Sequence, residues 1–567
     1  MYVLQQAKQQ VLTELKQAVK GLSPTQADLA TPPDPSMGDI AFPCFALAKQ
    51  MKQAPDEIAR EIAAKIGSKG FIERVNAVGP YVNFIFSNAT FGSSVLGEIQ
   101  KLGKAYGVST VGEEKRVMVE YANLNSHKDV HIGHLRNLFV GQMAVEVLKM
   151  NGYDVVPVAY INDLGVHVAK SVWAMKKYHG EEQVPKEDRI KFLREVYVEA
   201  NAKLEEDPSL KEEVSQVFLE LENQRGEDVA RWKETRDWSI DYLRDVYDEL
   251  GLTLEHWYFE SDLILKTKKI IDQLIEDGLA VESEGAWIVD LRDEDLGVNL
   301  LIKSDGTLLY NAKDLGLAMK KEEDYHPLRS IYVVDMRQSH ALKQLFATLK
   351  RMEFDRELIH LAYDFVTLSD GAMAARKGNV VRYEVFRDEM IARAHAETRE
   401  RHEDWSLKKV NTVSRAVAFA AIRFGMLKQD LEKSIVFDLE QAMSFEGYTG
   451  PYLLYTYARI QRLFTKVKKI KLDYAATKLT EPSAHDLMIL LSSYPEVVFS
   501  IGQTLQLSRL PQYLFDLAKT FSAFYNDVPI ATAEPEIAAQ RLALSEAVQQ
   551  VLENGMELMG ITPVDEM

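Results

Sequence analysis

Residues 116–162 decide the fold, and they read RVMVEYANLNSHKDVHIGHLRNLFVGQMAVEVLKMNGYDVVPVAYIN. The apolar run at 116–122 predicts a buried strand. Apolar residues then recur every four positions from Leu135, which predicts an amphipathic helix that ends at Asn151 and Gly152. A second apolar run completes a strand–helix–strand unit, and such a unit predicts a parallel sheet.

Two histidines, His131 and His134, lie at the turn between the first strand and the helix, with Gly133 between them. Ligands of open α/β sheets sit at the carboxyl ends of strands, and the free N–H groups of a helix start favour an anion. Residues three apart share a helix face, so both rings can donate hydrogen bonds to one phosphate group as its charge grows. Gly133 leaves room for a base or ribose near the backbone. The pattern therefore predicts a nucleotide site.

Two other interpretations of this pair stay open on the residues alone. The histidines can be ordinary residues at a helix start, or they can be two ligands of a metal ion. Metal ligands on helices are more often four residues apart and need a third donor, and the strand–turn–helix context favours the nucleotide.

The composition bounds the class of protein. The chain has 567 residues, 46% of them hydrophobic, and a formal net charge of −18. This length suggests about two to four domains, and the charge disfavours a generic basic nucleic-acid-binding protein without excluding local basic patches. Cys44 is the single cysteine, which excludes an intrachain disulfide and a cysteine-based zinc site. Neither a signal-peptide core nor a stretch of about 18 apolar residues occurs, so we expect a cytoplasmic protein with no membrane partner.

The first region, residues 1–108, has the pattern of a small α+β domain. Helical periodicity occurs near 2–20 and 55–66, and an alternating run at 75–86 predicts strands around a Gly-Pro turn. The polar stretch at 107–115 is the expected boundary.

The second region, residues 109–405, contains the predicted parallel sheet and an insertion near 181–240. Residues 181–230 carry 15 acidic and 7 basic side chains, a local balance of −8, which indicates a solvated helical insertion. Strand patterns resume at 285–291 and 330–336.

The third region, residues 406–567, is helical in pattern almost throughout and contains a local reversal of charge. Residues 451–480 hold seven basic side chains against Asp473 alone, with aromatic residues interleaved. Such a segment is a candidate for phosphate and base contacts, although taken alone a charge run is more often a solvated helix face.

The histidine segment and its flanks resemble the ATP-binding signature of class I aminoacyl-tRNA synthetases, specifically that of arginyl-tRNA synthetases. Asn125 stands six residues before the first signature histidine, and Lys128 three before it, as in that family. Five further stretches resemble family elements in the expected order: VGPYVNFIF (78–86), TLLYNAKDLGLA (307–318), VVDMRQSHALKQLF (333–346), FEGYTGPYLLYTYARIQRL (445–463) and RLALSEAVQQVLENGMELMGITPVDEM (541–567).

The resemblance implies a multidomain enzyme: an N-terminal α+β domain that binds the tRNA elbow, a central Rossmann-like α/β catalytic domain with a helical insertion, and an all-α anticodon-binding bundle. The implied reaction joins L-arginine to tRNA(Arg) through an arginyl-adenylate for translation and releases AMP and pyrophosphate. ATP with Mg²⁺ is a substrate, and we expect no tightly bound metal site. The implied partners are tRNA(Arg), ATP and L-arginine. We further expect a monomer.

The resemblance also assigns residues to the site. The residues implied for ATP binding are Lys128, His131, Gly133 and His134. The residues implied for arginine binding are Asn125, Glu260, Tyr310, Asp314 and Gln338. Carboxylates suit this task because they pair with a planar guanidinium in a directed way, and Tyr310 and Asp314 are four residues apart, on one helix face.

The second class I signature corresponds to SDGAMAARKGNVV, residues 369–381, and departs from the usual pattern. Ala372 replaces the first lysine of that signature and Ala374 replaces its serine. We therefore expect Lys128 to act in place of the missing lysine, with Arg376 and Lys377 as additional catalytic cations of the loop.

The resemblance places RNA contacts in both outer domains. Tyr81 and Asn83 match the surface that meets the tRNA elbow, and an aromatic ring there can stack on a base. The candidates for the anticodon stem and loop are Tyr448, Tyr452, Arg459 and Lys466. Tyr448 stands where an Asn is usual and Leu454 where a Gln is usual, so either residue can alter base contacts.

Rival functions fit the sequence less well. A cysteinyl enzyme would need a zinc site that one cysteine cannot supply. A glutamyl or glutaminyl enzyme would need cations around the substrate side chain in place of Asp314 and Glu260. A catalytically silent RNA-binding homologue is disfavoured by the intact histidine signature with Asn125 and Lys128.

Overall fold

The computed structural model describes residues 1–180, 182–369, 381–467 and 470–567, and it confirms the predicted succession of fold types. The N-terminal domain is a three-stranded antiparallel sheet in the order β1-β3-β2. Its elements are α1 (Val3–Ala18), β1 (Ile40–Pro43), α2 (Phe45–Met51), α3 (Pro55–Lys65), β2 (Ile72–Val78), β3 (Tyr81–Phe86) and α4 (Ser93–Leu102). The hairpin and both helices predicted for this region are present. Their apolar faces form one core because the periodicity of each element places its large side chains on a single side.

The central sheet has five parallel strands in the order β11-β10-β4-β5-β6. They are β4 (Arg116–Glu120), β5 (Asp154–Ile161), β6 (His256–Phe259), β10 (Arg329–Asp335) and β11 (Glu357–Tyr363). Helix α5 (Ile132–Met150) connects β4 to β5, which confirms the predicted strand–helix–strand unit. The chain builds outward from β4 in both directions, so the strand order reverses between β4 and β10. In such a sheet, ligands bind at the carboxyl ends of the strands beside that reversal.

One predicted strand lies outside this sheet. Residues 285–291 form β8 (Ala286–Asp290), which pairs antiparallel with β7 (Val281–Ser283) and β9 (Val298–Ile302). Glu284 and Gly285 both have positive φ, the conformation of a tight two-residue hairpin turn. Because of this turn, β8 pairs with β7 and β9, which are close to it in sequence, and does not join the central parallel sheet.

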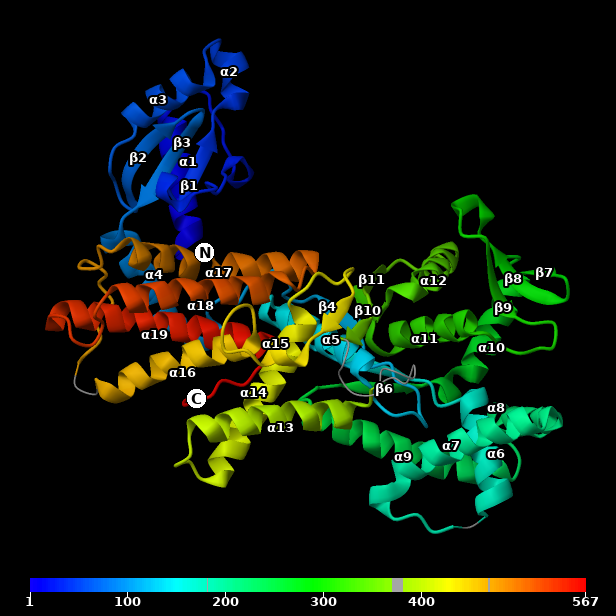
Figure 1. Cartoon of the computed structure of the whole chain (residues 1–567). Coiled ribbons are helices and arrows are strands. Elements are labelled where there is room, and N and C mark those ends of the chain that lie inside the picture. The colour runs from blue at the N-terminus through cyan, green and yellow to red at the C-terminus, as the bar shows by residue number, and fades with distance from the viewer. Residues whose placement is uncertain (181, 370–380, 468–469) are drawn as a thin grey trace.

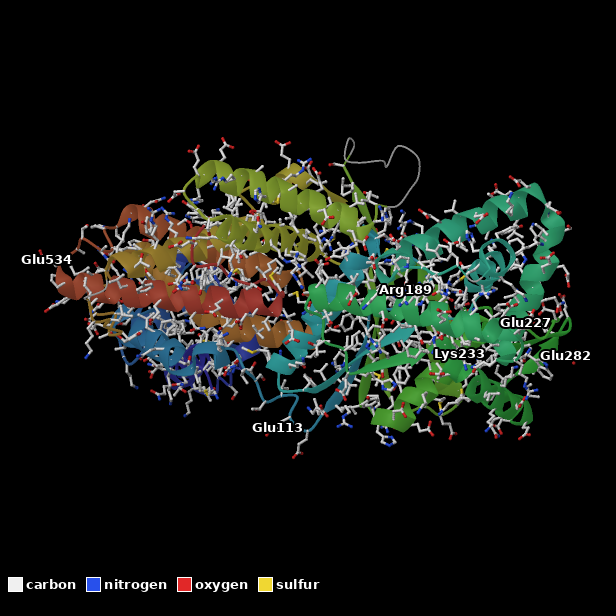
Figure 2. All side chains as sticks on the ribbon, turned by 90° about the horizontal axis from the view of Figure 1, so that it is seen from below. Glu113, Arg189, Glu227, Lys233, Glu282 and Glu534 are labelled. Carbon is white, nitrogen blue, oxygen red and sulfur yellow. The ribbon has the colours of Figure 1, made fainter. Side chains whose placement is uncertain are left out.

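The helical insertion comprises α6 (Val166–Ala174), α7 (Arg189–Glu206), α8 (Lys211–Asn223) and α9 (Asp228–Glu249). It is more than a solvated extension, because apolar residues of all four helices, such as Leu193, Leu221 and Trp232, are buried in a core that continues into the neighbouring part of the catalytic domain, residues 264–349. The charged residues Arg189, Glu227 and Lys233 of this insertion all lie in the half of the molecule away from Glu534 (Figure 2).

Four further helices and a two-stranded sheet belong to the described residues of the catalytic part. They are α10 (Glu260–Glu276), α11 (Tyr310–Tyr325), α12 (Ser339–Arg351), β12 (Val366–Leu368) with its parallel partner β13 (Ile435–Phe437), and α13 (Tyr383–Arg401).

The C-terminal part is a helical bundle, as predicted. Its helices are α14 (Leu407–Leu427), α15 (Leu439–Met443), α16 (Gly450–Lys466), α17 (Pro482–Thr504), α18 (Arg509–Asp527) and α19 (Pro535–Leu558). The N-terminal domain stands on α17 (Figure 1), where Lys8 pairs with Glu496 at 2.6 Å and Asp39 with His485 at 2.8 Å. None of the helices in the described part of the chain is both long enough and apolar enough to cross a membrane.

Candidate active site

A cavity of about 420 Å³ opens at the carboxyl ends of the central strands, beside the reversal between β4 and β10. Five residues predicted for the site line it together: Asn125, His134, Tyr310, Asp314 and Gln338. They come from the loop after β4, from α5, from the start of α11 and from the turn after β10. Asn125 and Gln338, more than 200 positions apart in the sequence, thus share one cavity because parallel strands end at one edge of the sheet.

The two histidines stack on each other at the start of α5. Their ring centroids lie 3.4 Å apart with 21° between the planes, and the backbone N–H of His131 donates to Nδ1 of His134 at 3.2 Å. Because Nδ1 of neutral His134 accepts, its Nε2 carries the hydrogen and is a donor. A Cβ on Gly133 would lie 3.1 Å from two atoms of the His131 ring, so the glycine also keeps this stack uncrowded.

Both imidazoles are neutral near pH 7. Burial lowers the pKa of His131 to about 4, and burial together with the neighbouring His131 ring lowers the pKa of His134 well below its usual value. The positive charge of Lys128 pushes both pKa values down further. Each ring therefore offers one N–H donor to an incoming anion without carrying a charge of its own.

Lys128 is exposed on the loop between β4 and α5 and is close enough to lower the pKa of three histidines, His131, His134 and His167. It forms no ion pair with any described residue and is therefore a cation available beside the histidine stack. The other cations predicted for this site, Arg376 and Lys377, lie outside the described residues.

Asp314 is one of three acidic residues that line the cavity, with Glu120 and Asp335. Burial and the nearby Glu260 carboxylate raise its pKa to about 7, although Lys313 acts in the opposite direction. Tyr310, one helical turn earlier on α11, is 61% exposed and lies at the cavity mouth. A carboxylate that faces a cavity and has no ion-pair partner among the described residues is suited to bind a cationic ligand.

Glu260 is placed differently from the other predicted arginine ligands. It is 1% exposed at the start of α10, where it accepts from Asn162 Nδ2 at 2.5 Å and forms an ion pair with Lys313. It does not line the cavity and instead acts on Asp314 through its charge.

Several residues of the cavity were missed by the sequence analysis. They are Glu120, Asn137, Tyr160, Asn162, Tyr332, Asp335 and Tyr363. Glu120 and Asp335 are polar residues at strand ends, a signal that marks the ligand edge of a parallel sheet. Tyr160 left no such signal, because it reads as one more apolar residue of a buried strand; its hydroxyl has no hydrogen-bond partner among the described residues.

The residues predicted to meet the tRNA elbow differ in exposure. Tyr81 is 37% exposed, and its ring meets the exposed ring of Phe45 edge to face at 5.7 Å. Asn83 is only 2% exposed, because it lies in β3, the central strand of the small sheet. The aromatic pair Tyr81 and Phe45, and not the Asn83 side chain, forms the surface here.

In the helical bundle, Arg459 and Lys466 line a groove of about 910 Å³ between α14, α16 and the last residues of the chain. Trp405 and Lys409, which the sequence analysis did not identify, lie in the same groove, with Lys409 Nζ 3.9 Å from the centre of the Trp405 ring. Within the basic segment 451–480, α16 ends at Lys466, and the described residues 470–480 are not helical.

The other bundle candidates are partly or wholly internal. Tyr448 is half-buried between Phe424 and Phe515, and its hydroxyl donates to Lys428 O at 3.3 Å. Tyr452 is also half-buried, with its hydroxyl 3.0 Å from Ser522 Oγ. Leu454 is 0% exposed, so its side chain belongs to the core and offers no surface to a base.

No group of three or more His, Cys, Asp or Glu side chains suited to a metal ion occurs within the described residues.

Comparison with known families covers nearly the whole chain. Residues 98–439 match the family described as "tRNA synthetases class I (R), catalytic domain". Residues 453–567 match "DALR anticodon binding domain", and residues 5–86 match "Arginyl tRNA synthetase N terminal domain".

Individual relatives agree with these matches. The chain is 38% identical to the arginine--tRNA ligase of Bdellovibrio bacteriovorus, over 95% of this chain and 94% of that protein. It is 34% identical to the arginine--tRNA ligase of Clostridium acetobutylicum, over 94% of this chain and 95% of that protein. Among solved structures, Thermus thermophilus arginyl-tRNA synthetase superposes with a TM-score of 0.81 at 26% identity, over 99% of this chain and 100% of that one. A Plasmodium falciparum arginyl-tRNA synthetase shares the fold, with a TM-score of 0.79 at 19% identity and 99% coverage of both chains.

Proposed function

The chain belongs to the arginyl-tRNA synthetase family, and from this premise we propose that it joins L-arginine to tRNA(Arg) for translation, at the expense of ATP. One observation carries the proposal: His134 of the ATP signature and Asp314, a carboxylate suited to a cation, line the same cavity. A nucleotide and a cationic amino acid can therefore meet there.

In the first step, a carboxylate oxygen of arginine attacks the α-phosphorus of ATP, and pyrophosphate leaves with the electron pair of the broken P–O bond. The N–H groups of His131 and His134 stabilise the added negative charge, and Lys128 supplies the positive charge that the departing pyrophosphate needs. Mg²⁺ enters with ATP as part of the substrate. In the second step, the ribose hydroxyl at the tRNA 3′ end takes the arginyl group and AMP leaves. Neither step needs a covalent nucleophile of the enzyme.

Selection of arginine rests on the balance of charges around the cavity. Glu120 pairs with Lys321, Asp335 with Arg337 and Glu260 with Lys313. Asp314 has no ion-pair partner among the described residues. One uncompensated carboxylate matches one guanidinium, with Tyr310 and Gln338 at the mouth and Asn125 toward the ATP loop for the amino or carboxylate end of the substrate.

The outer domains supply the RNA contacts in this proposal. Tyr81, with Phe45, stacks at the tRNA elbow, and the groove with Arg459 and Lys466 receives the anticodon region. We take residues 1–108, 109–405 and 406–567 as the three functional domains. The enzyme acts as a cytoplasmic monomer.

The test is ATP–pyrophosphate exchange, measured with each amino acid separately and with tRNA present. The proposal requires exchange that depends on arginine. Exchange driven by another amino acid would identify a different synthetase. RNA binding without exchange would identify a catalytically silent homologue.

A further inference from the structure

The loop that presents Lys128, residues 126–130, is held by helices of the insertion as well as by the central sheet. The sheet contributes one backbone bond, from Ser126 N to Asn162 O at 3.1 Å. At His127 the chain turns with φ at 59°, in the left-handed region, where a residue with a side chain is strained unless its surroundings fix it. The contacts that fix it come from α9.

Three hydroxyl side chains on one face of α9 bind this loop. Thr235, Ser239 and Tyr242 are spaced at i, i+4 and i+7, which aligns them along the helix. Ser239 Oγ accepts from the backbone N–H of His127 at 2.9 Å, and Tyr242 OH accepts from that of Val130 at 3.0 Å. Thr235 Oγ1 lies 2.9 Å from His127 Nε2.

The direction of the Thr235 bond follows from its neighbours. Thr235 Oγ1 also lies 3.0 Å from Arg231 O and 3.1 Å from Trp232 O, and a carbonyl oxygen can only accept. Thr235 therefore donates its hydrogen to the helix and accepts from Nε2 of His127. Nδ1 of the same ring then accepts from Ser126 Oγ at 2.9 Å, which fixes a neutral ring in one tautomer.

Helices α7 and α13 also contact the loop. Asp129 pairs with Arg194 of α7 at 2.9 Å. Tyr242 OH, which accepts from Val130, donates its own hydrogen to Glu384 Oε1 of α13 at 2.7 Å. Both neighbours of Lys128 and the residue before His131 are thus fixed from outside the sheet.

We propose that Thr235 and Tyr242 are positioning residues for adenylate formation: they fix the backbone at 127–130 so that Lys128 and His131 reach the phosphates of ATP. The inference rests on the proposed function, because it takes Lys128 and His131 to act on ATP. It gives the last helix of the insertion a part in the chemistry, although no α9 side chain lines the central cavity.

The first experiment compares Thr235→Val with Thr235→Ser in the full-length enzyme, by steady-state aminoacylation with arginine, ATP and tRNA. Valine has the shape of threonine but no acceptor, whereas serine keeps the hydroxyl and loses the methyl group. We expect Thr235→Val to lower kcat/KM for ATP about tenfold, the scale of one lost buried hydrogen bond, with KM for arginine unchanged. Thr235→Ser should stay near wild type. If kcat/KM for ATP falls equally in both variants, or if Thr235→Val keeps the wild-type value, the proposed role of the hydroxyl is wrong.

The second experiment uses Tyr242→Phe with Tyr247→Phe as its matched control. Tyr247 lies on the same helix and is buried more deeply than the half-buried Tyr242, but its hydroxyl donates to Ala122 O at 2.9 Å, before the loop begins. We expect Tyr242→Phe to lower kcat/KM for ATP about tenfold while Tyr247→Phe does not. If kcat/KM for ATP falls equally in both variants, the effect comes from the packing of α9 and the proposal is wrong.

The two hypotheses fail in different ways. If the proposed function is wrong, the wild-type enzyme itself shows no arginine-dependent charging. If only the positioning role is wrong, the wild type charges arginine and the Thr235→Val and Tyr242→Phe variants retain its ATP kinetics. Thermal unfolding midpoints identify any variant that has lost stability instead of geometry.

Discussion

The raised pKa of Asp314 makes a specific prediction about how arginine binding depends on pH. Burial and Glu260 raise this pKa to about 7, and only the ionised carboxylate pairs well with a guanidinium. With a pKa of about 7, the group is about 10% ionised at pH 6 and about 90% ionised at pH 8. We therefore expect kcat/KM for arginine to rise roughly tenfold from pH 6 to pH 8.

The histidines do not titrate between pH 6 and pH 8, so they do not contribute to this pH dependence. The pKa of His131 is about 4 and that of His134 is well below its usual value, so both rings stay neutral from pH 6 to pH 8. The assay is steady-state aminoacylation at subsaturating arginine and constant free Mg²⁺. The control is kcat/KM for ATP at saturating arginine over the same pH range, which corrects for the ionisation of ATP.

A matched variant and a binding measurement sharpen the test. Asp314→Asn cannot ionise, so its kcat/KM for arginine should fall about a hundredfold at pH 8 and lose the rise between pH 6 and pH 8. Calorimetry of arginine binding at pH 7, in buffers with different ionisation enthalpies, should show release of about half a proton per site. A flat wild-type profile together with no proton release would refute the assignment of Asp314.

Three other predictions test separate parts of the molecule. His134→Ala should leave the unfolding midpoint unchanged and lower adenylate formation about a hundredfold, the scale of one lost charge-stabilising donor; unchanged turnover would remove its role. Leu454→Gln should lower the free energy of unfolding by about 1–3 kcal/mol, because Leu454 is wholly buried, and should leave KM for tRNA intact. Denaturant unfolding and aminoacylation measure the two effects. An unchanged free energy of unfolding together with an altered KM for tRNA would indicate that Leu454 contacts the RNA. Lys466→Ala should raise KM for tRNA several-fold and reduce the slope of log KM against log salt by about 1; an unchanged slope would exclude a phosphate contact.

The parts of the fold that the sequence predicted correctly are those fixed by local periodicity. The hairpin around Gly79, the helix from Leu135 and the strand–helix–strand unit all follow from the spacing of apolar residues within one or two elements. β8 has an equally good strand pattern, but periodicity does not report its partner. Its place in a separate sheet depends on the turn at Glu284 and Gly285.

The sequence predicts His134 and Asp314 for one site because each stands in a motif typical of its chemistry, and the two side chains line the same cavity. The exposure of single side chains was not predictable, because it depends on contacts between distant segments. Glu260 is paired with Lys313, 53 residues later. Asn83 is buried because β1, from a distant part of the chain, pairs with β3 on the side opposite β2. A motif match assigns a residue to a neighbourhood, and the packing decides whether it touches the ligand.

The pairing of Glu260 with Lys313 leads to one more prediction, on how the arginine site is tuned. Glu260 raises the pKa of Asp314, and Lys313 lowers it. Glu260→Gln removes the first effect and leaves the second, now with Lys313 unpaired. The midpoint of the pH profile for arginine should then move below about 7.

The affinity for arginine should fall in the same variant, because Lys313 then repels the guanidinium while Asp314 still attracts it. A loss of about tenfold in kcat/KM with a lowered midpoint indicates that Glu260 acts through the charge of Asp314. A larger loss with an unmoved midpoint would mean that Glu260 leaves Lys313 and binds the substrate directly. The pH profile, and not the size of the loss alone, therefore separates a charge that tunes the site from a charge that contacts its ligand.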